Sequence, residues 1–354
     1  MAPAGSSYII VGAGVFGVST AYHLIRKYPS ASVTLVDRDA FDADSRVAAS
    51  WDWNKVMRAD YDDPVYCELA LEAQDAVTRR VLELGVAYVA DEVAALQVDR
   101  AGRCTGVRTA GGRSLEAAHV VLCTGAFTPK LLEVSAAASG LDALQAGSRI
   151  LAGGITTGMT RLDDASYAKF ADMPVGIQGY TTLKAPFMGS LPPTKDRELK
   201  WWGQKIFKNT KEVLPGRFIS MPPAEADYAQ WKISERLKED ILNVSSAFYG
   251  SQAAKWKFEK HRICWDAFTT SSDFIISPHT AAKGLYVATC GSFHGYKFFP
   301  VIGKYVVDML EDSLPAQLAN KWAWDRERPD PSVNPDWPSF EMKDLLDPVR
   351  EARL

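Results

Sequence analysis

The amino-terminal region carries the glycine pattern of a turn that binds a dinucleotide. It consists of Gly12, Gly14 and Gly17. The turn follows the apolar run 8–11 and opens a helix predicted over 18–28, and a second apolar run, 32–36, ends in Asp37 about 20 residues after the last glycine. The first glycine permits a tight turn, the second lets the backbone approach a pyrophosphate, and the third lets helix and strand pack closely. Free N–H groups at the helix start favour phosphate, and the Asp37 carboxylate can accept hydrogen bonds from a ribose.

Cys264 has sequence neighbours that would make its thiol reactive. Cys264 lies on a predicted strand in the segment Arg262-Ile263-Cys264-Trp265-Asp266, with Arg262 on the same face because strand side chains alternate. The thiolate is the nucleophilic form, and a nearby cation lowers the pKa of a thiol. The alternative interpretation is a buried core cysteine. That alternative applies to the remaining cysteines, which are Cys67, Cys104, Cys123 and Cys290.

The elements that position these residues follow an α/β pattern at both ends of the chain. Beyond the glycine turn, the pattern comprises strands over 119–123, 274–276 and 284–289, a turn over 290–297 and a helix over 300–310. The strand 119–123 is of the buried type and stops at Gly125, an ending typical of a dinucleotide domain that closes over its cofactor. These segments predict a Rossmann-type domain.

The middle of the chain differs in composition from both ends, and this difference indicates a second domain. It is rich in proline and contains a predicted strand over 199–207 and a predicted helix over 231–244. We expect residues 151–261 to form an α+β substrate domain with an antiparallel sheet that covers the cofactor. The dinucleotide domain is then discontinuous, with the parts 1–76, 85–150 and 262–324.

Composition excludes several classes of protein. The 354 residues are 47% hydrophobic and 23% charged, a globular balance that excludes wholesale disorder, collagen and coiled coil and predicts about two domains. The net charge is −3 without a basic stripe, so we expect no nucleic-acid partner. No Cys-x-x-Cys pair and no His, Asp or Glu cluster has metal-ligand spacing, so we expect no metal.

The same sequence bears on location. No apolar run reaches the length of a membrane span, and residues 1–7 lack a basic region, so we expect neither membrane insertion nor secretion. The final Ala352-Arg353-Leu354 matches the small-basic-Leu pattern of peroxisomal addresses. We therefore expect a peroxisomal monomer, or a cytoplasmic one if the pattern is not used.

Four segments together resemble the D-amino-acid oxidase superfamily of FAD oxidoreductases. Within it, the resemblance is to monomeric sarcosine oxidase and to the fungal fructosyl amino acid (amadoriase), saccharopine and pipecolate oxidases. The segments are 10–17, 54–58, 262–266 and 289–303. In that family they correspond to the start of the FAD site, the residues beneath the flavin, the covalent-flavin cysteine and a flavin and substrate motif. The resemblance covers nearly the whole chain.

One departure from the family stands near residue 77. In the family, a long segment of the substrate domain separates the helix after the Lys/Arg motif from the strand expected at residue 86. Here residues 73–76 run directly into 77–85, so a segment the size of a subdomain is missing. A natural deletion, an alternative splice form and a faulty gene model are the alternatives. The FAD motifs remain, and the departure affects the substrate side.

The resemblance implies FAD as the cofactor, joined covalently to the Cys264 sulfur. The residues that it places around FAD are Gly12, Gly14, Val15, Phe16, Gly17, Asp37, Arg38, Ser50, Asn54, Lys55, Val93, Gly125, Cys264, Phe293, Gly295, Tyr296 and Lys297.

The resemblance also implies a cationic site for the substrate. Lys297 and Arg58 are the candidates to bind a substrate carboxylate, because two converging cations give strong, directional hydrogen bonds. Holding the carboxylate would place the substrate Cα–H over flavin N5. His294, in the same turn as Lys297, either lies near the substrate amine or packs in the core.

A further cation beside the flavin would stabilise the charge that develops when O2 is reduced. Lys200 and Lys55 are the candidates for this role, with Lys205 as a rival to Lys200. Several tryptophans flank the motifs and would suit an apolar substrate as cavity walls, or belong to the core. They are Trp51, Trp53, Trp201 and Trp202.

The resulting prediction is a FAD-dependent amine oxidase. It would take hydride from the carbon next to the amine of an N-substituted amino acid (N-methyl, fructosyl, cyclic or saccharopine-like), giving an imine, with O2 reduced to hydrogen peroxide. The alternatives are a flavin dehydrogenase with another electron acceptor, a non-catalytic or truncated flavin-binding form, and a nicotinamide dehydrogenase.

Overall fold

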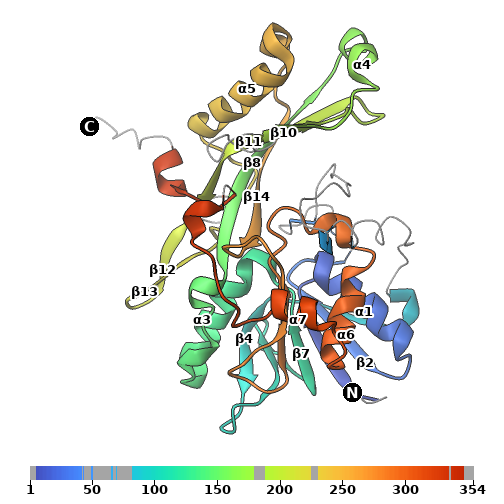
Figure 1. The fold of residues 1–354 in the computed structure, drawn as a ribbon, viewed down its shortest axis with the longest axis vertical. Helices are drawn as coiled ribbons and strands as arrows, with labels where there is room; N and C mark the ends of the chain where they lie inside the picture. The colour runs from blue at the N-terminus through green and yellow to red at the C-terminus, as the bar shows by residue number, and fades with distance from the viewer. Residues whose placement is uncertain are drawn as a thin grey trace.

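The chain folds into two bodies, each built on one large sheet (Figure 1). The computed structural model describes residues 5–41, 43, 49–50, 65–66, 69, 82–178, 188–224, 230–334 and 336–346. The lower body in Figure 1 holds a mostly parallel sheet, and the upper body holds a mostly antiparallel sheet. This arrangement confirms the predicted combination of an α/β domain with an antiparallel-sheet domain.

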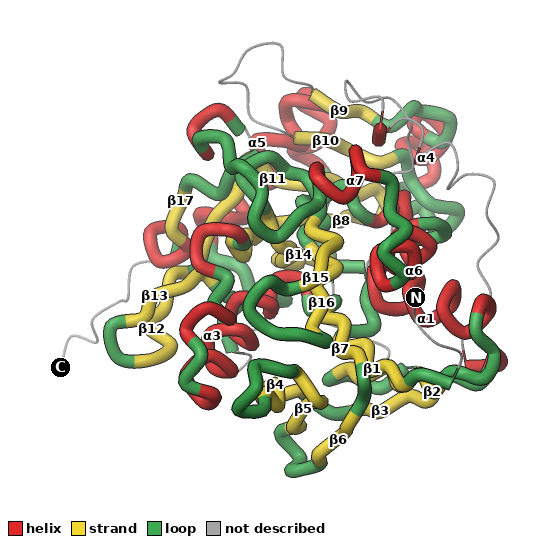
Figure 2. The backbone as a smooth tube through the Cα atoms, turned by 60° about the horizontal axis from the view of Figure 1, so that its bottom comes forward, coloured by secondary structure: helices red, strands yellow, loops and turns green. Residues whose placement is uncertain are grey.

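The lower sheet has the strand order β15-β16-β7-β1-β2-β3 (Figure 2). Its strands are β1 (Ser7–Val11), β2 (Ser32–Asp37), β3 (Ala87–Ala90), β7 (His119–Leu122), β15 (Ile275–Pro278) and β16 (Leu285–Thr289). Neighbours run parallel, except that β15 and β16 are antiparallel. Because β2 and β7 flank β1 on opposite sides, the strand order reverses at β1, which is where open parallel sheets bind ligands.

Successive side chains of β1 point to opposite faces of this sheet, and both faces are buried. Tyr8 and Ile10 belong to the core formed with α1 (Val15–Lys27) and α6 (Ile302–Leu310). Ile9 and Val11 belong to the core formed with α3 (Thr128–Ser139), a helix that the sequence did not predict. A small sheet also covers the α3 face; its strands are β4 (Val93–Val98), β5 (Cys104–Thr109) and β6 (Ser114–Glu116).

Gly303 brings α6 close to α1. A Cβ at this position would lie 2.1 Å from the carbonyl carbon of Ser19, and the Gly303 N–H donates a hydrogen bond of 2.9 Å to the Ser19 hydroxyl. The close crossing fixes the start of α6 relative to α1. It therefore also fixes the turn that precedes α6.

The upper sheet has the strand order β14-β8-β11-β10-β9. Its strands are β8 (Leu151–Arg161), β9 (Gly176–Gln178), β10 (Met188–Leu191), β11 (Glu198–Lys208) and β14 (Lys260–Phe268). Alternation along β11 separates its faces. Leu199 and Trp201 pack against α5 (Glu235–Tyr249), and the Trp201 indole donates a 2.9 Å hydrogen bond to the Ile241 carbonyl. The intervening side chains face the lower body.

Helix α5 starts later than the sequence predicted, at Glu235 rather than residue 231. The Ser234 hydroxyl caps it by accepting a 3.2 Å hydrogen bond from the Leu237 N–H. The helix then continues past the expected end at residue 244. The remaining elements are α4 (Asp164–Phe170), β12 (Thr210–Leu214), β13 (Arg217–Ser220), α7 (Ala316–Lys321) and β17 (Phe340–Glu341).

Strand β14 and the carboxyl-terminal tail connect the two bodies. Residues 260–268 pair with β8, so the expected domain boundary at residue 262 falls inside a strand of the upper sheet. After α7 the tail returns to the upper body, where β17 pairs with β11 and Met342 and Leu345 are buried. The tail therefore runs along both bodies after Trp324.

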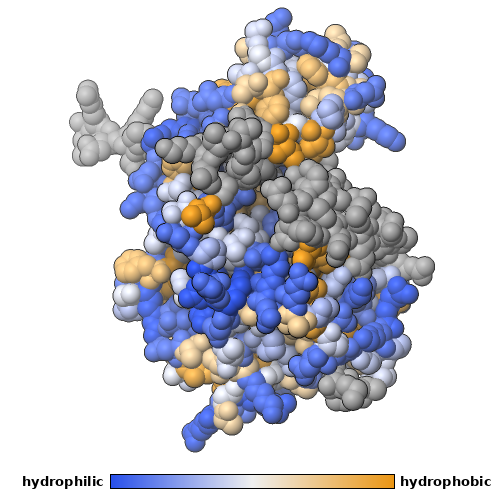
Figure 3. Space-filling view, viewed as in Figure 1, coloured by the Kyte–Doolittle hydropathy of each residue, from blue (hydrophilic) through white to orange (hydrophobic). Residues whose placement is uncertain are grey.

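On the face shown in Figure 3, hydrophilic residues predominate and apolar residues form small separate patches. None of the described helices is long and apolar enough to cross a membrane. Among the described residues, no group of three or more His, Cys, Asp or Glu side chains is arranged to hold a metal ion.

His279 is a buried histidine of the lower body. Its ring lies 4.4 Å from that of Trp324. Its Nδ1 accepts from the Ala281 N–H and its Nε2–H donates to the Leu144 carbonyl, both at 3.2 Å. Burial lowers its pKa from 6.5 to about 4. The folded protein therefore keeps this imidazole neutral where the unfolded chain protonates it, so stability is lost as the pH falls from about 6.5 towards 4.

We expect the His279→Gln variant to have a flatter dependence of stability on pH. Between about pH 7 and pH 5, the free energy of unfolding of the wild type should fall by about 2 kcal/mol more than that of the variant, because each unit of pKa difference contributes about 1.4 kcal/mol. Urea unfolding of both proteins at the two pH values measures this difference. Parallel losses in the two proteins would contradict it.

Candidate functional site

A cavity of about 550 Å³ lies between the carboxyl ends of β1, β7 and β16 and the inner face of the upper sheet. Apart from Gly17, every predicted cofactor residue in the described part of the chain lines it. These are Gly12, Gly14, Val15, Phe16, Asp37, Arg38, Ser50, Val93, Gly125, Cys264, Phe293, Gly295, Tyr296 and Lys297, and the predicted catalytic residues Lys200 and His294 join them. The predicted residues Asn54, Lys55 and Arg58 lie outside the described residues.

The glycine turn between β1 and α1 is too tight for other residues. Gly12 has a φ of +100°, and a Cβ there would lie 2.5 Å from the Cys123 carbonyl oxygen. A Cβ at Gly17 would lie 1.8 Å from the Gly12 carbonyl oxygen, so Gly17 acts by packing rather than by lining the cavity. Gly14 caps α1 without a side chain, and the first turn of α1 contains no acid. The start of the helix therefore leaves N–H groups and a positive dipole end for an anion.

Asp37 lies at the end of β2, beside this turn. Its Oδ2 accepts a 2.6 Å hydrogen bond from the Ala13 N–H, and its Oδ1 accepts one of 3.0 Å from the Asp39 N–H. The two bonds hold the carboxylate at the cavity wall, where a hydroxyl donor can reach it. Next to it, the Arg38 guanidinium lies 4.8 Å from the centre of the Phe127 ring.

The turn over 290–297, between β16 and α6, is a strained wall of the cavity. Three of its residues other than glycine have positive φ, namely Cys290 at +68°, Ser292 at +46° and Phe293 at +61°. Asp266 of β14 holds the turn, since its Oδ2 accepts a 2.9 Å hydrogen bond from the Phe293 N–H. Strain of this kind persists only where surrounding structure enforces it, and it is typical of functional sites.

His294 packs in an aromatic cluster at the edge of the cavity. Its Nε2–H donates a 2.8 Å hydrogen bond to the Ser272 carbonyl. Its ring stacks on Phe274 with a centroid distance of 5.0 Å and meets Tyr66 edge-on at 5.1 Å. Of the two interpretations that the sequence left open, this geometry favours packing.

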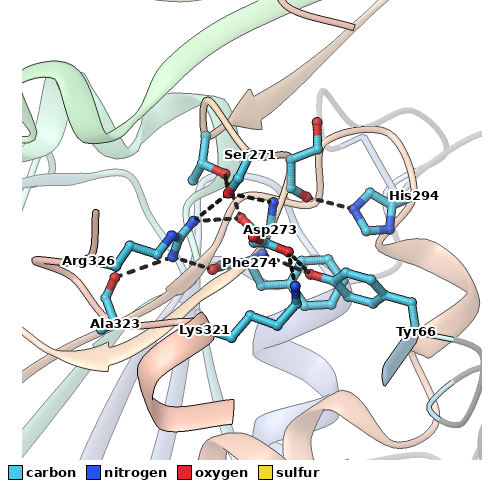
Figure 4. A network of polar contacts seen from close by, with 10 residues as sticks. Tyr66, Ser271, Asp273, Phe274, His294, Lys321, Ala323 and Arg326 are labelled. Carbon is cyan, nitrogen blue, oxygen red and sulfur yellow. Dashed lines mark hydrogen bonds and ion pairs between the residues drawn. The ribbon is translucent and has the colours of Figure 1, made fainter. Parts of the chain in front are cut away.

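A polar network behind His294 holds the loop over 269–274 (Figure 4). The Asp273 carboxylate accepts a 3.1 Å hydrogen bond from the Tyr66 hydroxyl and pairs with the Lys321 ammonium at 3.0 Å. The Arg326 guanidinium donates to the carbonyls of Phe274 and Asp273 at 2.8 and 3.2 Å. Burial raises the pKa of the Tyr66 phenol well above its usual value, so the hydroxyl stays a donor. No sequence motif marked these residues.

Two lysines of the cavity are buried. Lys297 is 5% exposed and Lys200 is 4% exposed. Lys200 lies on the inner face of β11, whereas its sequence rival Lys205 pairs with Asp240 of α5 at 3.5 Å, on the outer face. The cavity wall thus includes two buried lysines from opposite bodies, one on the turn over 290–297 and one on β11, in addition to the partly exposed Lys130.

Cys264 lies at the cavity in an apolar cluster with Ile155, Trp202 and Phe293. Arg262, two residues earlier on β14, is wholly buried, and its guanidinium carbon lies 5.7 Å from the Trp231 ring centre. The other described cysteines are buried with raised thiol pKa values: burial raises that of Cys104 to about 11 and raises those of Cys123 and Cys290 further. Their thiols are inert, in line with a core role.

The residues present fit a dinucleotide that reaches from the glycine turn to the upper sheet. The helix start lacks an acid and a side-chain cap, the volume suits a cofactor, and the lining combines apolar side chains with polar ones such as Asp37 and Thr289. Among the described residues, the buried Thr289 hydroxyl at the end of β16 has no hydrogen-bond partner and lines the cavity, so it can serve a ligand.

Solved structures share this fold. A thermally stable mutant of a fructosyl peptide oxidase superimposes with a TM-score of 0.82 at 18% identity, covering 99% of this chain and 100% of that one. Amadoriase II, a fructosamine oxidase from Aspergillus fumigatus, gives 0.76 at 19% identity, covering 98% of this chain and 97% of that one.

Two curated relatives are similar in sequence. The L-saccharopine oxidase of Schizosaccharomyces pombe is 20% identical over 422 residues, covering 89% of this chain and 92% of the relative. An amino acid oxidase of Aspergillus flavus is 44% identical over 57 residues, which are 16% of this chain and 12% of the relative.

The family model of FAD dependent oxidoreductases matches residues 7–83 and 70–309. The matched part includes the glycine turn, the inner face of the upper sheet and the turn over 290–297, all of which line the cavity. This chain therefore belongs to the FAD dependent oxidoreductase family.

Proposed function

We propose that this FAD-dependent enzyme oxidises the C–N bond of an N-substituted amino acid to an imine and passes the electrons to O2. The observation that carries the proposal is the single cavity in which a dinucleotide turn, Cys264 and two buried lysines meet. The proposal is supported by the names of the relatives, because the curated relative and the solved structure are both named oxidases. The imine then hydrolyses in water, and hydrogen peroxide is the second product.

Lys297 has the position and charge to bind the substrate carboxylate. Its ammonium lies in a buried wall, where a charge-assisted hydrogen bond is stronger than in water. Holding the carboxylate fixes the carbon that bears the amine relative to the cavity. Bound FAD supplies the hydride acceptor and later reduces O2 by two electrons.

Lys200 is positioned to assist the reduction of O2. It is a buried cation on the opposite body from Lys297, beside the apolar side chains of Trp202 and Leu191. A fixed positive charge in a low-dielectric wall stabilises negative charge that develops on O2. The apolar neighbours limit water at this end of the cavity.

Cys264 is the proposed point of covalent attachment of FAD. Its sulfur lies in the cavity wall, and forming a thioether to a flavin methyl carbon removes the thiol hydrogen and one methyl hydrogen. The two electrons go to O2, which the overall reaction already uses. We also propose that the chain acts as a monomer.

The Cys264→Ala variant tests the attachment. Acid precipitation of the wild type should leave the yellow flavin in the pellet, whereas precipitation of the variant should release it to the supernatant. Cys104→Ala is the matched control, because Cys104 is buried away from the cavity. Release of the flavin from the wild type would rule out the covalent link and leave the FAD assignment intact.

The Lys297→Met variant tests the carboxylate role. Its kcat/KM for an N-methyl amino acid should fall about 10- to 100-fold, because a hydrogen bond to a charged group contributes about 1.5–3 kcal/mol. The loss should vanish for the corresponding amine without a carboxylate. Lys304→Met, on the exposed side of α6, is the control. An equal loss with both substrates would point to a role other than carboxylate binding.

The peroxisomal address of residues 352–354 is also a proposal, and these residues lie outside the described part of the chain. A fluorescent protein ending in the last residues of this chain should collect in peroxisomes, and the same fusion without residues 352–354 should stay diffuse. A diffuse signal from both fusions would show that residues 352–354 do not act as a peroxisomal address.

A further inference from the structure

The inner face of the upper sheet presents a largely apolar floor to the cavity. Strand pairing places Thr157 of β8 opposite Trp202 of β11, Trp202 opposite Gly189 of β10, and Gly189 opposite Ile177 of β9. The neighbouring row pairs Lys200 with Leu191. Residues opposite each other in a sheet point to the same side, so these rows form one surface.

Gly189 gives the Trp202 ring its place in this floor. A Cβ at Gly189 would lie 2.1 Å from Cζ2 and 2.2 Å from Cη2 of Trp202. The indole ring therefore lies across β10, over the position where any other residue would carry a side chain. The preceding Trp201 is fixed on the opposite face by its hydrogen bond to Ile241, which keeps β11 from turning over.

The polarity of the floor limits what can lie on it. In the described parts of β8, β9, β10 and β11, the cavity wall consists of the side chains of Ile155, Thr157, Ile177, Leu191, Lys200 and Trp202. Its polar groups are the Thr157 hydroxyl, the Lys200 ammonium and the indole N–H of Trp202. A substituent with several hydroxyls would lose water there without enough hydrogen-bond partners, at a cost for each unpaired group. An apolar ring loses nothing and gains burial.

We propose that Gly189 and Trp202 determine substrate specificity by forming a platform for an apolar, preferably cyclic or aromatic, N-substituent of the amino acid. This inference rests on the proposed amine oxidation and narrows its substrate class. A polyhydroxylated substituent such as a fructosyl group is disfavoured on the same surface. The selectivity comes from the flat indole face and from the absence of a side chain at Gly189.

The experiment compares two substrates that differ only in the N-substituent. N-benzylglycine and N-fructosylglycine share the carboxylate and the amine, and N-methylglycine is the small reference. The kcat/KM of the wild type should be about 10- to 100-fold higher for N-benzylglycine than for N-fructosylglycine, because the benzyl ring is buried on the floor. Gly189→Ala and Trp202→Ala should lose most of this preference, measured as the ratio of kcat/KM for N-benzylglycine to kcat/KM for N-methylglycine within each variant. Trp202→Phe should keep part of it.

A binding measurement on the holoenzyme separates this inference from the function itself. Phenylacetate and acetate are redox-inert ligands that differ by a ring, and calorimetric titration gives their Kd values. Both alanine variants should have a Kd for phenylacetate about 10-fold higher than the wild type and an unchanged Kd for acetate. If no amine reduces the flavin, the proposed function fails, and the titration still decides the platform. Equal phenylacetate binding by all variants, or a preference for N-fructosylglycine, would overturn the inference.

Discussion

The close approach of α1 to the end of β1 is the constraint on which the site depends. With a Cβ at Gly17 lying 1.8 Å from the Gly12 carbonyl oxygen, no residue other than glycine allows it. The approach turns the start of α1 towards the cavity. It also sets the position of α6, which crosses α1 at Gly303, and of the turn over 290–297 that precedes α6. The close contacts of α1 at Gly17 and at Gly303 thus place both the start of α1 and the turn that carries Lys297.

The second requirement is a firm connection between the two bodies. Asp266, on a strand of the upper sheet, accepts a hydrogen bond from Phe293 in the turn of the lower body. The turn has three residues with positive φ other than glycine and needs such support. Behind it, Arg326 and Lys321 hold the loop over 269–274, whose Ser272 carbonyl accepts a hydrogen bond from His294. A cavity that must align groups from two sheets is therefore closed by hydrogen bonds rather than by apolar contact alone.

The sequence predicted the parts of the site that are local in the chain. The glycine turn, Asp37, Cys264 and the turn over 290–297 each form a short pattern whose chemistry is readable without neighbours, and the structure brings them to one cavity. Tyr66, Asp273 and Gly189 were missed because their roles arise from contacts with residues distant in the sequence. Helix α3 was missed as well, and α5 was placed too early because its Ser234 cap was not recognised. The motif over 54–58 and the expected missing segment near residue 77 lie outside the described residues.

We expect FAD to occupy this cavity between the glycine turn and the upper sheet. The most direct measurement is the visible absorption spectrum of the purified protein together with the molar ratio of flavin to chain. We expect a yellow protein with about one FAD per chain, whose colour bleaches when an N-substituted amino acid is added without oxygen. A colourless protein that binds NADH instead of flavin would contradict it.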